Sequence, residues 1–203
     1  MGCNAFAYCL NNPITFGDPN GTDAIVLLRN EREGELDVAH LGIMVQDEDG
    51  QWYHYFWGAR RRWLVLSALK PNYYYPAIGT LVKYEGEITL EAINASGVYS
   101  GYDKMIYLTG DFSGTLDELP IAENGYPNGN YFEGYNLINN NCSQTSLGAL
   151  ANQDTPYQDA LKNAFSRVLP ESAFRVVEDD VMYKPCHSGG DAGKIQIRTV
   201  LLR

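Results

Sequence analysis

A histidine and a cysteine that together could carry out nucleophilic thiol chemistry lie about a hundred residues apart in this chain. His40 lies in the apolar run VAHLGIMV of residues 38–45, and Cys142 lies in the polar run YNLINNNCSQ of residues 135–144. Such chemistry needs a thiol that can become a thiolate and an imidazole that takes its proton. We therefore predict that Cys142 is a nucleophile and that His40 is its general base.

The residues around Cys142 predict the start of a helix. Asn140 or Asn141 is a good N-cap, and Leu147 and Leu150 give the following residues an apolar face. A cysteine in the first turn feels the positive end of the helix dipole and unpaired backbone N–H groups, and both are expected to lower its pKa. Its own N–H could also donate to an oxyanion. The alternative is a small buried cysteine that packs the start of the helix.

The run around His40 predicts a strand with two different faces. Alternation places Ala39, Leu41, Ile43 and Val45 on one face, and Val38, His40, Gly42 and Met44 on the other. A glycine beside His40 on the same face predicts open space next to the imidazole, as a substrate channel would need. The alternative is a structural histidine whose hydrogen bonds are satisfied within the fold.

Two further histidines compete for a place in the site. His54 lies 14 residues after His40, in the expected partner strand, and could orient it as a third member. A tight two-residue turn would put the two histidines on opposite faces, whereas an odd-length loop or a bulge would bring them together. His187 follows Cys142 by 45 residues and is an alternative base. However, it lies in a glycine-rich run without a strand to hold it.

The remaining pattern predicts an α+β fold. The expected strands are residues 24–29, 38–46, 51–57, 80–84, 104–109 and 194–202, and the expected helices are residues 143–152 and 157–169. Asp-Gly at residues 49–50, between two apolar runs, predicts a hairpin turn. Residues 110–134 are rich in Gly, Pro and Asn and are predicted to form a loop. Three tyrosines, Tyr53, Tyr55 and Tyr135, are possible oxyanion donors.

These motifs together resemble a known group of enzymes. His-x-Gly-Ile at residues 40–43, a hairpin with a second polar residue, and Asn-Cys-Ser at the start of a helix are similar to the circularly permuted papain-like group. That group is related to NlpC-type cell-wall hydrolases and includes lecithin retinol acyltransferase-like proteins and deubiquitinating-type peptidases. The resemblance covers roughly residues 36–152. It implies an antiparallel sheet packed against a helix that carries the cysteine at its N-terminus. It further implies Cys142 as nucleophile, His40 as general base and His54 as the orienting residue.

Residues 1–22 differ from the rest of the chain. They contain FAYCLNNP at residues 6–13 and Asp-Pro-Asn-Gly at residues 18–21, two turn clusters that flank a short extended piece. This run resembles the end of the RHS repeat-associated core domain, in which a repeat shell encloses a variable C-terminal toxin. The resemblance implies that residues 1–22 are the tail of such a core domain and that residues 23–203 form an effector domain.

Composition excludes several other classes of protein. The net charge of −10 and a pI near 4.7 argue against nucleic acid as a partner, since binding a phosphate backbone requires clustered Lys and Arg. The four cysteines, Cys3, Cys9, Cys142 and Cys186, are too scattered for a zinc site or a disulfide framework. We therefore expect no metal or other cofactor. No signal peptide and no membrane span are expected, so that delivery to a target cell would use a non-classical route.

The residues accordingly favour a cysteine-dependent hydrolase or acyl transferase, of the peptidase, amidase or deamidase type, as the effector of an RHS-type polymorphic toxin. Its substrate would be a protein, a peptide or another acyl compound, and a cognate immunity protein is a possible partner. The alternative is a non-catalytic papain-like interaction module that binds a protein or glycan partner through its Tyr- and Trp-rich surface. A nuclease, the third possibility, is disfavoured by the acidic pI.

Overall fold

The computed structural model describes residues 22–30, 39–59, 74–97, 99–120, 122–123, 126–127 and 134–183. Several sequence predictions lie outside these ranges. They are the RHS-like run of residues 1–21, the strand at residues 194–202, and His187 with its neighbour Cys186. The other predictions can be compared with the structure.

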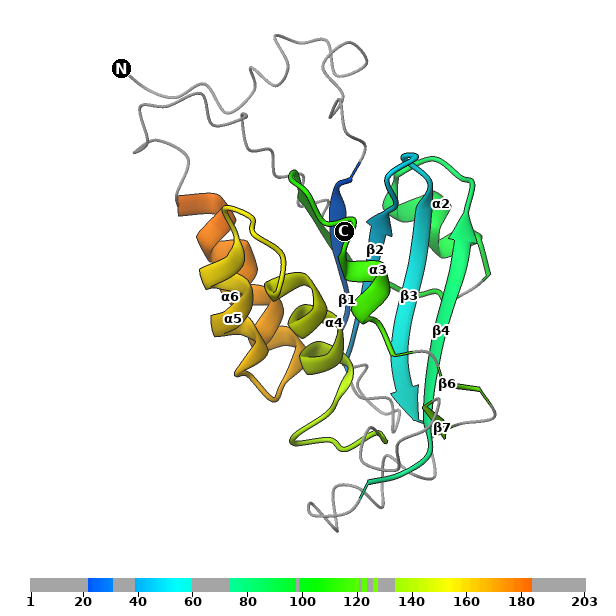
Figure 1. Ribbon diagram of the computed structural model, residues 1–203, viewed down its shortest axis with the longest axis vertical. Coiled ribbons are helices and arrows are strands. Elements are labelled where there is room, and N and C mark those ends of the chain that lie inside the picture. The colour runs from blue at the N-terminus through cyan, green and yellow to red at the C-terminus, as the bar shows by residue number, and fades with distance from the viewer. Residues whose placement is uncertain are drawn as a thin grey trace, which may run out of the picture.

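A five-stranded antiparallel sheet forms the centre of the fold (Figure 1). Its strands are β1 (Ala24–Arg29), β2 (His40–Gln46), β3 (Trp52–Ala59), β4 (Ala77–Tyr84) and β5 (Lys104–Leu108), in the order β4-β3-β2-β1-β5. Two short strands, β6 (Ala122–Glu123) and β7 (Tyr126–Pro127), pair separately. The predicted strands in the described ranges are confirmed: β1 has its predicted bounds, and each of the others differs by one to three residues at one or both ends. The α+β class is confirmed as well.

The hairpin between β2 and β3 has the turn that its sequence predicts. The Asp47 side chain accepts hydrogen bonds from the backbone N–H groups of Asp49 and Gln51, and Gly50 takes a positive φ of 78°. Gln46 pairs with Trp52 at the end of the ladder, so five residues connect the two strands. This odd number decides which face of the sheet His54 occupies.

Three helices form a layer on one face of the sheet: α4 (Cys142–Ala151), α5 (Gln158–Phe165) and α6 (Pro170–Tyr183) (Figure 1). The first two confirm the predicted helices, although α5 ends four residues earlier than expected. The third was not predicted. Its sequence nevertheless carries a signal for a helix, because a proline stands at the first position and a single stripe of residues is buried. That stripe consists of Ala173, Phe174, Val177 and Val181.

Two short helices were also not predicted. Helix α2 (Leu90–Ala95) begins at Thr89, whose hydroxyl accepts a hydrogen bond from the N–H of Ala92. Helix α3 (Thr115–Glu118) and strands β6 and β7 lie within residues 110–134, which the sequence predicts as loop. That prediction is therefore wrong for these pieces, since elements of two to four residues are too short to show a periodic pattern.

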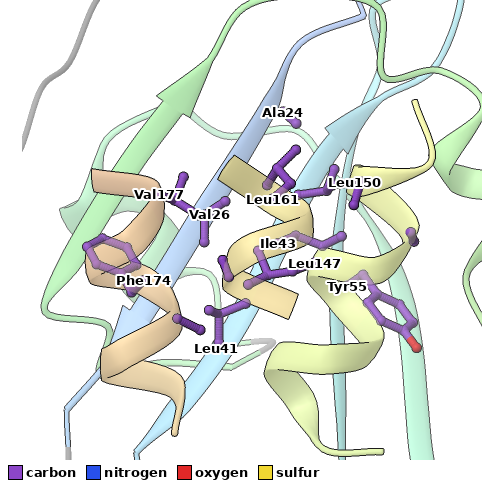
Figure 2. Close-up of a cluster of buried hydrophobic side chains, with 14 of the residues drawn as sticks. Ala24, Val26, Leu41, Ile43, Tyr55, Leu147, Leu150, Leu161, Phe174 and Val177 are labelled. Carbon is purple, nitrogen blue, oxygen red and sulfur yellow. The ribbon is translucent and has the colours of Figure 1, made fainter. Parts of the chain in front are cut away.

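The two faces of the sheet carry separate hydrophobic clusters. The helix face contains Ala24, Val26, Leu41, Ile43 and Tyr55 from the strands, with Leu147, Leu150, Leu161, Phe174 and Val177 from the helices (Figure 2). The opposite face, which we call the α2 face, contains Ile25, Leu27, Met44, Tyr84, Leu90, Ile93, Tyr102 and Met105. Alternation along β1 and β2 therefore separates the core into two layers.

Candidate functional site

Cys142 is the first residue of α4, and side-chain hydrogen bonds hold the N-terminus of this helix in place. Asn141 is the N-cap: its side-chain oxygen accepts from the N–H of Gln144, and the Gln144 side chain accepts from the N–H of Asn141. These reciprocal bonds form a capping box. The Asn141 amide also donates to the backbone carbonyls of Leu137 and Val168, each at 2.8 Å. The predicted N-cap is thus confirmed, and it ties α4 to two neighbouring loops.

Two further asparagines, Asn136 and Asn140, shape the turn that precedes Cys142. The Asn136 side chain accepts from the N–H groups of Ile138 and Asn139. The Asn140 side chain donates to the carbonyl of Gly134, and the Trp57 indole of β3 donates to the Asn140 carbonyl. The turn and the sheet are therefore joined immediately before the cysteine.

The thiol of Cys142 is almost completely buried, with 2% of the residue exposed. Burial raises the pKa of this thiol. The N–H of Leu41 opposes this increase most strongly, and the hydroxyl and N–H of Ser143 also favour the thiolate. The expected lowering of the Cys142 pKa is therefore wrong. The donors exist at the helix start, but the loss of solvent outweighs them.

Cys142 and His40 approach the same short stretch of β2 from different faces of the sheet. The sulfur interacts with the backbone N–H of Leu41, the residue after His40. The side chain of Leu41 packs in the helix-face cluster, and alternation sends His40 to the α2 face. In the described part of the chain, no hydrogen bond joins the thiol to His40 or His54.

His40 and His54 lie on the same face of the sheet. His54 pairs with Met44, and Met44 lies four residues after His40 in β2, so that its side chain points to the same face as His40. The five-residue connection therefore gives the odd loop length that a shared face requires. However, His54 does not bond to His40. Its Nε2 lies 2.9 Å from the Tyr102 hydroxyl instead, and its Nδ1 is buried without a hydrogen-bond partner.

The space beside His40 is filled. A Cβ atom built on Gly42 would lie 2.4 Å from the Tyr102 hydroxyl, so this glycine makes room for a tyrosine. The prediction of an open channel at Gly42 is therefore wrong for this conformation. The signal in the sequence was real, since the glycine does mark a close approach, but a side chain from a distant segment occupies it.

Burial keeps both histidines neutral near pH 7. Desolvation lowers the pKa of His40 to about 3, with smaller effects from the charges of Arg29 and His54. Desolvation also lowers the pKa of His54 to about 4. The Nε2 of His40 is buried without a hydrogen-bond partner. A neutral imidazole with an unoccupied ring nitrogen can accept a proton, although a buried imidazolium needs a negative charge nearby to be stable.

Aromatic residues that the sequence did not single out for the site surround the two imidazoles. The Tyr99 ring lies 4.6 Å from the His40 ring, and the Arg29 guanidinium lies 5.0 Å from the centre of Tyr99. Tyr102 packs edge-on against His54 at 5.6 Å. Nothing in local spacing shows these contacts, because they join β1, β2 and β3 to the segment before β5.

All three predicted oxyanion donors lie in the described residues, and Tyr53 is half-buried in β3, where it pairs with Val45 of β2. Tyr55 points into the helix face, and its hydroxyl donates to the carbonyl of Pro120, so it is engaged elsewhere. Tyr135 is buried, and the nearby Cys142 raises its pKa in addition to the larger effect of burial. Tyr135 therefore stays protonated near the thiol, as a donor must.

Comparison of the chain with protein-family models, with curated proteins and with solved structures gave no match. Within the described residues, no group of three or more His, Cys, Asp or Glu side chains could hold a metal ion. In the same ranges, no helix is long and apolar enough to cross a membrane.

Proposed function

We propose that this protein is a cysteine-dependent hydrolase or acyl transferase with Cys142 as its nucleophile. The observation that carries the proposal is the position of Cys142. It is the first residue of a helix fixed by a capping box, and its sulfur faces the N–H of Leu41, next to His40. A helix start offers N–H groups to a thiolate and to an oxyanion, and the residue of β2 that precedes Leu41 carries an imidazole on the other face of the sheet.

The chemistry starts from a neutral pair. Because the two side chains lie on different faces of the sheet, a rearrangement must first bring them together. The Cys142 thiol would then transfer its proton to His40, and the thiolate would attack the carbonyl carbon of an acyl donor. The tetrahedral intermediate would collapse to a thioester on Cys142, and His40 would return the proton to the leaving group. Water would then resolve the thioester in a hydrolase, and an amine or alcohol would do so in a transferase. His54, bonded to Tyr102, would act through its packing near His40 rather than through a direct hydrogen bond.

Acylation of Cys142 tests this proposal directly. The protein is mixed with a series of p-nitrophenyl esters of increasing chain length, and the release of p-nitrophenol and the intact mass are followed. We expect a burst of p-nitrophenol and an acyl adduct that peptide mapping assigns to Cys142. His40→Ala should reduce the burst rate by about a hundredfold or more, the usual scale for loss of a general base.

Two controls keep the result specific. A variant with Cys3, Cys9 and Cys186 replaced by Ser contains Cys142 as its sole thiol and should behave as the wild type. Cys142→Ala in that background should lose the adduct. If adducts form at equal rates with and without His40, or on other residues only, the enzyme proposal fails.

We also propose, from the resemblance of residues 1–22, that this activity serves an RHS-type toxin that is delivered by a non-classical route and opposed by an immunity protein. Inducible expression in the bacterial cytoplasm or periplasm tests this. Growth arrest by the wild-type chain and normal growth with Cys142→Ala would support a toxic enzyme. Normal growth with both in both compartments would contradict it.

Burial of the thiol favours a second function, a non-catalytic interaction module. The 2% exposure of Cys142, its raised pKa and the tyrosine over Gly42 are all typical of a closed structural site. In this case Cys142→Ala would keep any toxicity or partner binding, and no acyl adduct would form on the wild-type protein.

A further inference from the structure

Four exposed apolar side chains lie together at one end of the helix layer. Ile138 lies in the turn before α4. Phe165 is the last residue of α5, and Val168 and Leu169 lie in the connection from α5 to α6. Within the described residues, no other large hydrophobic side chain is exposed, and the exposed fractions of these four run from 37% to 63%. Single exposed apolar residues are usual on a protein surface, whereas a group of them in one place marks a site of interaction. We call this group the loop patch.

Hydrogen bonds hold the loop patch in one arrangement. The Asn141 side chain donates to the carbonyls of Leu137 and Val168, each at 2.8 Å, so it joins the turn before α4 to the connection between α5 and α6. The Phe165 ring lies against α4, since a Cβ atom built on Gly148 would be 3.1 Å from two of the ring carbons. Both loops lie at the same end of the helix layer (Figure 1). The loop patch therefore needs little ordering before it binds a partner.

Positive charge borders the loop patch. Lys162 and Arg167 are exposed, and in the described part of the chain no ion pair engages either of them. Residues 162–169 contain no Asp or Glu, and the next acid along the chain, Glu171, is half-buried. A chain whose net charge is −10 thus presents two cations beside its exposed apolar side chains.

Exposed acids of the sheet connections lie at the opposite end of the molecule (Figure 1). Glu48 and Asp49 are in the turn that follows β2, and Glu85 and Glu87 are between β4 and α2. Strand β2 begins beside the start of α4 and extends for seven residues, or about 20 Å, toward this turn. Since the Debye length is about 8 Å at physiological ionic strength, these acids are largely screened from a ligand at the loop patch.

Apolar side chains bordered by cations match the surface of an anionic bilayer. Such a surface takes apolar groups into the boundary between headgroups and acyl chains and attracts Lys and Arg to its lipid phosphates. A protein partner is a poorer match, since protein interfaces depend most on Trp, Tyr and Arg, and the loop patch contains none of the 15 Tyr and 3 Trp residues of the chain. We propose that the loop patch docks this protein on the surface of an anionic lipid bilayer, with Lys162 and Arg167 at the headgroups. This peripheral binding goes beyond the proposed function and does not depend on the reactivity of Cys142.

Binding to lipid vesicles tests the proposal. The full chain is sedimented with vesicles of phosphatidylcholine that contain about 30% phosphatidylglycerol, and with vesicles of phosphatidylcholine alone. We expect the chain to bind the anionic vesicles at about 50 mM salt. Binding should be about tenfold weaker to the neutral vesicles, and also about tenfold weaker to the anionic ones at about 500 mM salt.

Variants of exposed residues assign the binding to the loop patch. Leu169→Ser removes its most exposed side chain and should lower the partition constant about tenfold, whereas Leu169→Met keeps an apolar side chain and should match the wild type. Lys162→Gln combined with Arg167→Gln should lower it about twentyfold on anionic vesicles. Lys83→Gln removes an exposed cation at the acidic end of the sheet and is the control, which should bind as the wild type does. Thermal unfolding confirms that each variant is folded.

Three results would overturn the proposal: no binding of the wild-type chain to anionic vesicles at low salt, equal binding to neutral vesicles, or unchanged binding of the loop-patch variants. Sedimentation velocity of the protein without lipid identifies a different occupant. A dimer that forms with rising concentration and is lost in Leu169→Ser, without vesicle binding, would assign the loop patch to a second copy of the chain. No acyl donor is present in these measurements, so their failure leaves the acylation test of Cys142 unaffected.

Discussion

The helix face and the α2 face of the sheet are built from alternate residues of the same strands, yet they differ in chemistry. The helix face is aliphatic and aromatic, and three helices cover it. The α2 face holds both described histidines, together with Tyr99 and Tyr102. Alternation allows this division because neighbouring residues of a strand never share a face. One face can thus be dedicated to stability while the other keeps polar groups, and Cys142 lies where they meet, beside the backbone of Leu41.

Placing both imidazoles in the interior of the α2 face costs free energy. Buried imidazoles lack solvent, and each has one ring nitrogen without a partner. Such groups are tolerated when they serve a function or when the rest of the fold is stable enough. The following predictions measure how different the two faces are.

Matched leucine truncations should show the largest difference. Leu147 in α4 and Leu90 in α2 are both buried, at 0% and 1% exposure. We expect Leu147→Ala to lower the free energy of unfolding by about 4 kcal/mol and Leu90→Ala by about 3 kcal/mol. The reason is that the small α2 cluster can collapse more easily around a cavity. Urea unfolding measures the free energy of unfolding of both variants. A larger loss in Leu90→Ala than in Leu147→Ala would show that the α2 face, and not the helix face, contributes more to stability.

Acid should destabilise the protein through the α2 face. The folded pKa values of His40 and His54, about 3 and about 4, lie below the ordinary histidine pKa of 6.5. Below pH 6.5 the unfolded chain therefore binds protons that the folded chain does not, and stability is lost as the pH falls toward 4. Between pH 7 and pH 5 we expect a loss of up to about 2 kcal/mol for each histidine.

Variants separate these histidines from the carboxylates that also titrate in acid. His40→Gln and His54→Gln should each flatten the dependence of the unfolding free energy on pH between 7 and 5. Measurement by urea unfolding at each pH is sufficient. An unchanged slope in both variants would show that the imidazoles are protonated, or solvated, in the folded protein.

The close approach at Gly42 gives a more local test. Gly42→Ala puts a methyl group where the Tyr102 hydroxyl lies, so we expect a loss of about 1.5 kcal/mol in the free energy of unfolding. Gly58→Ala in β3 is the control, because no atom lies within 4 Å of its Cβ position. Combining Gly42→Ala with Tyr102→Phe should recover part of the loss. Equal effects at Gly42 and Gly58 would mean that Tyr102 does not fill this space.

The smallest expected effect concerns the junction between the faces. Asn141→Ala removes the N-cap of α4 and should cost about 1 kcal/mol. Asn141→Ser keeps a cap oxygen but loses the two amide bonds to Leu137 and Val168, so it separates capping from loop anchoring. Thermal unfolding compares the two. If both variants match the wild type, α4 is held by its packing alone.

The candidate site shows how far local patterns reach. Asn141 as N-cap, the alternation around His40 and the turn at Asp49-Gly50 were predictable because each depends on residues a few positions apart. Helix α6 carried a periodic signal that the sequence interpretation overlooked. The roles of Cys142, His40 and His54 in catalysis remain predictions.

The sequence by itself determined the strands, the hairpin and the capped helix that begins at Cys142, because short-range hydrogen bonding and hydrophobic periodicity specify them. Only the tertiary structure decided that Tyr99 and Tyr102 cover the histidines and that the thiol is hidden from solvent. It thereby also decided the pKa of Cys142, which burial raises although the helix start favours the thiolate. Burial depends on segments that are far apart in the chain. Desolvation by burial makes the largest contribution to the pKa shifts of Cys142, His40 and His54.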